Sequence, residues 1–265
     1  MLVSMYKGLC LPSGDMSRAP KIFLKNLLTF ALSCDIISLS IEARKVMIPM
    51  NLIVFDTETT NGFDDPLCYD VGWTVMTEQG LILQTRSFVV ADIFLDEPQL
   101  MQEAFFASKI PQYFAEIADG KRELRRFKTI RKILHDDCKA FEVGAIMAHN
   151  MSFDYRSTST TQRWLTSSKY RYFFPYVVEL WDTLRMARQT FAKDEMYKQF
   201  CIENGFLVQN DEKRPQLTAE ILYKYISGNL SFQEEHTGLA DTLIEREIFM
   251  QCVQMNPNIE KKCWA

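Results

Sequence analysis

Residues 51–60, NLIVFDTETT, join a run of branched apolar side chains to two acidic residues. The apolar part predicts a short buried strand at 51–56. Side chains alternate between the two faces of a strand, so Asp56 and Glu58 are expected to point the same way. Two neighbouring carboxylates repel each other, and a divalent cation is the usual compensation. Taken alone, the pair is also explained as two solvated acids at a strand end.

The chain after this strand alternates predicted strands and helices. Residues 69–76 and 81–90 flank a Glu78-Gln79-Gly80 turn and predict an antiparallel hairpin, and 144–149 predicts another buried strand. A hairpin followed by helices and a further strand indicates an α/β fold with a mixed sheet. The helical pattern recurs at 97–118, 121–137, 151–167, 183–204, 216–227 and 237–253.

The composition is that of an ordinary globular protein. Of the 265 residues, 47% are hydrophobic and 24% charged, which disfavours general disorder. The 34 acidic and 30 basic residues give a net charge of −4, so a nucleic-acid ligand would need a local basic patch or metal ions. The 7 cysteines include no C-x-x-C pair. Reduced thiols and a cytoplasmic location are therefore expected, rather than a disulfide framework.

Residues 1–49 read differently from the rest. Lys25 and Asp35 interrupt their apolar run 22–41, which disfavours both a membrane span and a signal peptide. From Met50 the chain runs directly into the first strand, as a natural protein start would. We therefore hypothesise that 1–49 is an extension of uncertain status, followed by one domain at 50–255 and a short tail at 256–265.

Two further segments carry candidate catalytic side chains. Asp154 follows the buried strand 144–149 and is expected in the first turn of the next helix, where the helix dipole favours a carboxylate. His236 and Asp241 precede and begin the last predicted helix. Five residues turn a helix by roughly 140° beyond a full circle, so this pair converges only if His236 lies on the preceding turn. Each segment alone also has an ordinary structural explanation.

Together the three segments are far more specific. Asp56-x-Glu58, Asn150-x-x-Phe-Asp154 and His236-x4-Asp241 occur in the order that is typical of the DEDD exonuclease superfamily, and the chain resembles the subclass with a catalytic histidine. Members include the proofreading subunit of bacterial replicative polymerase, ribonuclease T and oligoribonuclease. The resemblance covers 50–252, and 173–187 and 214–229 look most like exonucleases of bacteria and their phages.

The resemblance implies a ribonuclease-H-like mixed five-stranded sheet flanked by helices. It also implies that four acids hold two Mg²⁺ or Mn²⁺ ions: Asp56, Glu58, Asp154 and Asp241. His236 would take a proton from the attacking water, a role that suits a side chain with an ordinary pKa near 6.5. The implied activity is 3′→5′ hydrolysis of single-stranded DNA or RNA, releasing nucleoside 5′-monophosphates.

The resemblance also suggests contacts with the 3′-terminal nucleotide. Thr57, Thr59 and Asn150 are expected to contact it, and Phe63 is a candidate to stack on a terminal base. Relatives commonly have Gly directly after the second Thr, whereas Asn61 intervenes here, so the contact residue stays open. Phe63 is equally explained as a core residue. The basic stretch 121–132 is either a track for a phosphate backbone or a solvated helix face.

Two other functions stay open on the sequence alone. A non-catalytic nucleic-acid or polymerase-binding module could keep the same fold, although the intact acids and His236 argue against it. An endonuclease is the third possibility. A polymerase partner or a homodimer is compatible with the resemblance, and no membrane partner is expected. The cell would be bacterial, or the host of a phage.

Overall fold

The structure, a computed structural model, describes residues 50–264 apart from 61–63, 170–171 and 210. The extension 1–49, and with it the hypothesis of a start at Met50, lies outside the described residues, as does Phe63. None of the helices in the described ranges combines the length and the hydropathy that crossing a bilayer requires.

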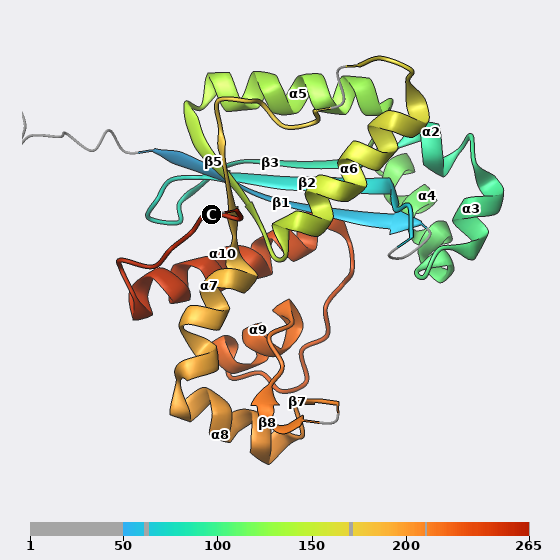
Figure 1. Cartoon of the computed structure of the whole chain (residues 1–265). Helices are drawn as coiled ribbons and strands as arrows, with labels where there is room; N and C mark the ends of the chain where they lie inside the picture. Colours follow the sequence, from blue (N-terminus) through green and yellow to red (C-terminus); the bar gives the residue numbers. More distant parts are fainter. Residues whose placement is uncertain (1–49, 61–63, 170–171, 210, 265) are drawn as a thin grey trace, which may run out of the picture. The chain divides into compact units, whose positions relative to one another are not determined.

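A six-stranded mixed sheet in the order β4-β3-β2-β1-β5-β6 forms the centre of the domain (Figure 1). β1 pairs antiparallel with β2 and parallel with β5, so it lies in the middle of the sheet. β2 also pairs antiparallel with β3, as the hairpin pattern predicts. The strands are β1 Asn51–Thr60, β2 Leu67–Met76, β3 Ile82–Val90, β4 Glu123–Arg125, β5 Val143–Ala148 and β6 Glu179–Asp182.

Alternation along β1 divides the core into two layers. Ile53 and Phe55 belong to the cluster on one face of the sheet, and Leu52 and Val54 to the cluster on the other. α5 and α6 cover the first face, whereas α7 and α10 lie on the second (Figure 1). Because side chains alternate, the acid at position 56 continues the second face and points toward α10.

Nine α-helices and two 3₁₀ turns complete the described part of the chain, with a small β7–β8 ribbon. The helices are α2 Ala91–Phe94, α3 Pro98–Glu103, α4 Ile110–Ala118, α5 Phe127–Ala140, α6 Met151–Leu165, α7 Thr183–Gln189, α8 Glu195–Asn204, α9 Ala219–Ser227 and α10 Gly238–Met255. The 3₁₀ turns are η2 Ala107–Lys109 and η3 Phe191–Lys193, and the ribbon joins β7 Leu207–Val208 to β8 Asp211–Pro215.

Three predicted helices are interrupted. The segment 97–118 breaks at Ala104, which adopts an extended conformation between α3 and η2. The segment 121–137 begins with β4, and its helix starts only at Phe127. The segment 183–204 breaks at Thr190, where φ is −115° and ψ is −85°. In the segment 216–227 the helix begins after Thr218, whose side chain accepts a bond from the N–H of Ile221.

The sheet has six strands, whereas the family resemblance implies five. Two of the six, the edge strands β4 and β6, lie outside the ranges predicted as strands; β4 pairs parallel with Phe88–Val90 of β3, and β6 pairs parallel with β5. The α/β class with a mixed sheet between helices is confirmed. After α10, Ile259 and Cys263 are buried, and Lys262 forms a bridge to Trp181 of β6. Residues 256–264 thus pack on the edge of the sheet.

Candidate active site

The second half of β1 lines a cavity of about 740 Å³. Asp56 and Glu58 are half-buried in its wall, on the strand face that α10 covers. The cavity receives every residue that the sequence predicts to be catalytic, namely Asp56, Glu58, Asp154, His236 and Asp241. Segments up to 185 positions apart along the sequence therefore meet at one place.

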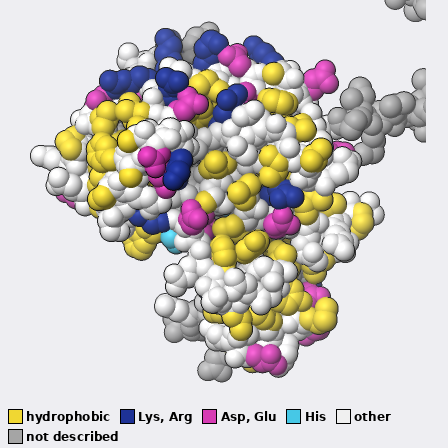
Figure 2. All heavy atoms as spheres, turned by 180° about the vertical axis from the view of Figure 1, so that it is seen from behind, with side chains coloured by type: hydrophobic (Ala, Val, Ile, Leu, Met, Phe, Trp, Pro, Cys, Tyr) yellow, Lys and Arg dark blue, Asp and Glu magenta, His cyan; other side chains and the backbone are white. Residues whose placement is uncertain are grey.

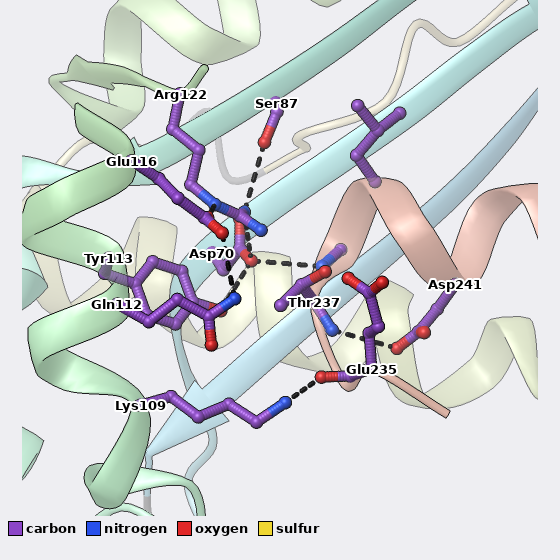
Figure 3. A network of polar contacts seen from close by, with 12 residues as sticks. Asp70, Ser87, Lys109, Gln112, Tyr113, Glu116, Arg122, Glu235, Thr237 and Asp241 are labelled. Atoms are coloured by element: carbon purple, nitrogen blue, oxygen red, sulfur yellow. Dashed lines mark hydrogen bonds and ion pairs between the residues drawn. The ribbon is translucent and has the colours of Figure 1, made fainter. Parts of the chain in front are cut away.

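The first turn of α10 lies directly on β1 and β2. Glycine permits this approach, because a Cβ atom on Gly72 would lie 2.2 Å from the backbone nitrogen of Leu239. Asp70 on β2 accepts a hydrogen bond of 3.0 Å from the backbone N–H of Gly238 (Figure 3). These contacts place Asp241, in the first turn of the helix, beside the strand carboxylates.

Asp70 is held in turn by a buried polar network (Figure 3). Its Oδ2 atom accepts hydrogen bonds from Tyr113 Oη at 2.7 Å and from Arg122 Nη1 at 2.8 Å. Arg122 also pairs with Glu116, so one guanidinium faces two acids. Burial raises the pKa of Asp70, and the charge of Arg122 opposes that rise. The network ties α4 to the N-terminus of α10.

The turn before α10 brings His236 back toward the acids. His236 has a φ of 49°, and it precedes the N-cap residue Thr237. Asp241 Oδ2 accepts a hydrogen bond of 3.1 Å from the N–H of Thr237 (Figure 3). One ligand atom each of Glu58, His236 and Asp241 lies within 4.8 Å of the others. The histidine and the aspartate meet because the histidine precedes the helix.

Asp154 enters the site from the opposite layer. It lies in the first turn of α6 and is 2% exposed, and its Oδ1 atom accepts a hydrogen bond of 2.9 Å from Thr57 Oγ1. Thr57 is also 3.1 Å from Ser157 Oγ. Asn150, at the N-cap of α6, is left-handed with a φ of 75°, and its N–H donates to Asp182 at 3.2 Å. This turn sets the direction in which α6 leaves β5.

Burial and mutual repulsion raise the pKa values of the acids in the cavity. Burial is the largest cause for each group, and it raises the pKa of Asp154 to about 7 and that of Asp241 to about 8. The pKa values of Asp56 and Glu58 also lie well above the ordinary range, with repulsion from neighbouring carboxylates added to burial. Such a site favours either protonation or a bound cation.

The ring of His236 is confined on several sides. Phe106 stacks on it with a centroid distance of 4.4 Å and an interplanar angle of 18°. Its Nδ1 atom is 3.9 Å from Glu234 Oε2. Burial, followed by the charge of Lys109, lowers the pKa of His236, so the neutral ring is favoured near pH 7. The side chain is still 37% exposed, which leaves it open to the cavity.

The predicted substrate contacts divide in the structure. Asn150 and Thr57 line the cavity, but the Thr57 hydroxyl is buried and bonded to Asp154. Thr59 is half-buried beyond a bulge in β1 and is not among the lining residues. Phe63 lies outside the described residues.

The basic stretch 121–132 is not part of the cavity wall. Arg122 is buried and paired with Asp70, and Arg126 and Lys132 pair with acids on the surface. Figure 2 shows Lys and Arg side chains gathered where α5 runs, and α5 covers the sheet face opposite α10. The solvated-face interpretation therefore fits this stretch better than a phosphate track.

Sequence analysis missed two acids of the site. Glu245 on α10 is 3% exposed and lines the cavity together with Glu234. Among the neighbouring carboxylates, Glu245 contributes most to the raised pKa of Asp56. The spacing of four residues from Asp241 was a usable signal, since such pairs share a helix face. Glu234 precedes the helix and had no periodic signal.

The donor set fits a hard divalent cation. The cavity offers carboxylate oxygens and two histidines, but no thiolate. The ring nitrogens of His149 are engaged with Thr183 Oγ1 and the carbonyl of Leu217, which leaves His236 as the histidine available to a cation. Asp241 Oδ1 is buried and has no hydrogen-bond partner among the described residues. An unpaired buried carboxylate oxygen is costly, and a bound cation would satisfy it. The lining also includes Arg188 and Arg214, from α7 and β8.

No family model and no curated protein matches this sequence. Solved structures do match its fold. E. coli Exonuclease I in complex with a 5cy-dT13 oligonucleotide gives a TM-score of 0.51 at 14% identity, over 79% of this chain and 41% of that one. A 3′-exonuclease with 3′-end specific recognition of a histone mRNA stem-loop gives 0.55 at 14% identity, over 94% of this chain and 79% of that one.

This chain thus spans less than half the length of Exonuclease I. Both TM-scores exceed 0.5, so the likeness concerns the fold. The chain therefore has a ribonuclease-H-like α/β fold, which it shares with these two solved exonucleases.

Proposed function

We propose that the protein is a metal-dependent 3′→5′ exonuclease that acts on single-stranded DNA or RNA and releases nucleoside 5′-monophosphates. The observation that carries the proposal is the convergence of four acids and one histidine on a single cavity: Asp56, Glu58, Asp154, Asp241 and His236. Three of them already offer ligand atoms within 4.8 Å of one another. The matched structures of nucleic-acid exonucleases support the same function.

The four acids would hold two Mg²⁺ or Mn²⁺ ions. Bound ions supply two effects in phosphodiester hydrolysis: they lower the pKa of the attacking water and neutralise charge on the departing 3′ oxygen. Without ions, clustered carboxylates repel a phosphate. Activity should therefore depend fully on the cation.

His236 would accept the proton of the attacking water. Its lowered pKa keeps the ring neutral and able to accept a proton at pH 7, and stacking on Phe106 limits its orientations. Thr57 would position Asp154 through its hydroxyl group. Asn150, Arg188 and Arg214 also line the cavity and would contact the substrate strand. The two arginines would bind its phosphates, because cationic side chains pair with phosphate oxygens.

The proposal includes a cytoplasmic location. The five described cysteines are all free and buried, as expected for a reducing compartment. A homodimer or a polymerase complex is compatible with the proposed activity, and gel filtration of the purified chain would detect the former.

The test uses the full chain with 5′-labelled single-stranded DNA and RNA of matched sequence, in Mg²⁺, Mn²⁺ or EDTA. We expect a ladder that shortens from the 3′ end with metal and is absent in EDTA. Asp56→Asn and His236→Ala should each reduce the rate at least 100-fold, whereas Asp119→Asn, at an exposed surface acid, should not. No cleavage by folded protein with either metal would instead favour a binding module. Cleavage of circular single strands would identify an endonuclease.

A further inference from the structure

α10 places a fifth carboxylate in the cavity. Glu245 lies four residues after Asp241, so the two side chains share one face of the helix, about one turn apart. Both line the cavity, together with Asp56 and Asp154. The helix therefore presents two acids to the site, of which the family motif includes only the first.

The burial of Glu245 requires an explanation. Its side chain is 3% exposed, and Oε2 has no hydrogen-bond partner among the described residues. No salt bridge to a described Lys or Arg neutralises it, and Asp154 and Asp241 repel it. Burying a carboxylate without a partner destabilises a protein, so an apolar side chain would suit a purely structural position better.

A contact with the backbone accounts for only part of the carboxyl group. The N–H of His149, at the end of β5, stabilises the charged form of Glu245. That contact fixes the side chain between α10 and the turn that leads into α6. It leaves Oε2 buried and without a partner among the described residues. Asp56 and Asp154 line the same cavity, and both interact electrostatically with Glu245.

We propose that Glu245 is a metal ligand, a fifth acid of the metal centre beside Asp56 and Asp154. The inference rests on the proposed function, since it concerns the same cations. A cation in contact with Oε2 would satisfy the unpaired oxygen and relieve the repulsion among the buried carboxylates. The position of Glu245 is thus explained by cation binding rather than by the fold alone.

Two variants of the full chain test this proposal. Glu245→Gln keeps the shape of the side chain but removes its charge. Glu247→Gln is the matched control, because it removes one charge from the same helix at a half-exposed residue that pairs with Arg246. Mn²⁺ binding is measured by titration calorimetry and by electron paramagnetic resonance of the free ion, without substrate.

We expect the wild type and Glu247→Gln each to bind two Mn²⁺ ions, with the same affinities in the two proteins. Glu245→Gln should lower the affinity for at least one of the two ions tenfold or more, as loss of a metal-site residue usually does. Its metal-free melting temperature should equal or exceed that of the wild type, since a buried repulsion is removed, while the rise in melting temperature on adding Mn²⁺ should shrink. If Glu245→Gln fails to fold, Glu245→Asp tests the same contact, because a side chain one methylene shorter should also weaken Mn²⁺ binding.

Two results would overturn the inference. Equal Mn²⁺ affinity and stoichiometry in folded Glu245→Gln and wild type would show that Glu245 is not a ligand, and a lower metal-free melting temperature with unchanged Mn²⁺ binding would make it a structural residue. Asp56→Asn separates this failure from that of the proposed function. If the wild type binds no Mn²⁺, both ideas fail, whereas binding that is lost in Asp56→Asn but kept in Glu245→Gln rejects only the role of Glu245.

Discussion

The backbone of Gly238 lies against the backbone of Gly72, and neither position has room for a Cβ atom. A Cβ on Gly72 would lie 2.2 Å from the nitrogen of Leu239, and one on Gly238 would lie 2.7 Å from the nitrogen of Gly72. This contact sets the first turn of α10 on the two central strands. The position of Asp241 on that turn therefore depends on two residues that have no functional side chain.

Gly72→Ala should damage both stability and activity. The new methyl group meets backbone atoms, which cannot rotate away, so α10 must shift. Overpacking of this kind lowers the free energy of unfolding by about 1–3 kcal/mol. The displacement of Asp241 should lower kcat more than it changes KM.

Gly120→Ala is the control for this variant. No atom lies within 4 Å of a Cβ built at Gly120, although its φ is 71°. Backbone strain in Gly120→Ala should lower the free energy of unfolding by about 1 kcal/mol, and kcat should not change. Urea unfolding and steady-state kinetics check both, and an unchanged kcat in Gly72→Ala would refute this dependence.

Asp70→Ala should destabilise the fold strongly. It leaves the buried guanidinium of Arg122 with Glu116 as its remaining acid among the described residues, and it removes the acceptor of the Gly238 N–H. Breaking a buried ion pair costs about 3–5 kcal/mol. Asp119→Ala, at an exposed pair with Lys121, should cost less than about 1 kcal/mol. Chemical denaturation compares the two, and equal losses would contradict the structural role of the network.

Thr57→Val should impair catalysis through Asp154. Loss of the hydroxyl donor raises the pKa of Asp154 further, so metal binding at neutral pH should weaken about 10–100-fold. The rate optimum should also move to higher pH. Thr60→Val is the matched control on the same strand, because Thr60 Oγ1 is buried with no partner among the described residues. It should be neutral or slightly stabilising. Identical pH–rate profiles for Thr57→Val and wild type would rule out the positioning role.

The metal-free protein should lose stability as the pH rises. The pKa values of Asp154 and Asp241, about 7 and about 8, lie above those of the unfolded chain. The folded state therefore binds more protons, and this stabilising contribution, complete below about pH 4, is lost as the pH rises through about 8. Melting temperatures in EDTA from pH 5 to 8.5 should fall, with a smaller slope in Asp241→Asn. A flat or rising curve in the wild type, matched by the variant, would contradict the raised pKa values.

The sequence predicts the parts of this molecule that have a local pattern. Alternation in NLIVFD places Asp56 on the face of β1 that meets α10, and the first-turn position of Asp154 follows from the strand before it. The paired strands around Gly80 are confirmed because apolar runs and a turn residue coincide there. The convergence of the motifs followed from family resemblance, not from any local rule.

The features that could not be predicted from the sequence are those that depend on tertiary contacts. β4 has three residues at a sheet edge, with Leu124 between two charged side chains, and is too short to give a strand pattern. The break at Thr190 has no Gly or Pro to mark it. Glu245 resembles an ordinary surface acid of a helix until the packing of α10 on the sheet buries it. Arg122 likewise belonged to a basic run, and only its pairing with Asp70 sets it apart.

Product analysis in H₂¹⁸O tests the central claim most directly. The full chain is incubated with single-stranded DNA or RNA and Mn²⁺, and the products are analysed by mass spectrometry at early times. The account predicts nucleoside 5′-monophosphates carrying one ¹⁸O, substrates shortened from the 3′ end, and loss of both in His236→Ala. Internal fragments, 3′-phosphate products, or no product from folded protein with any divalent metal would contradict it.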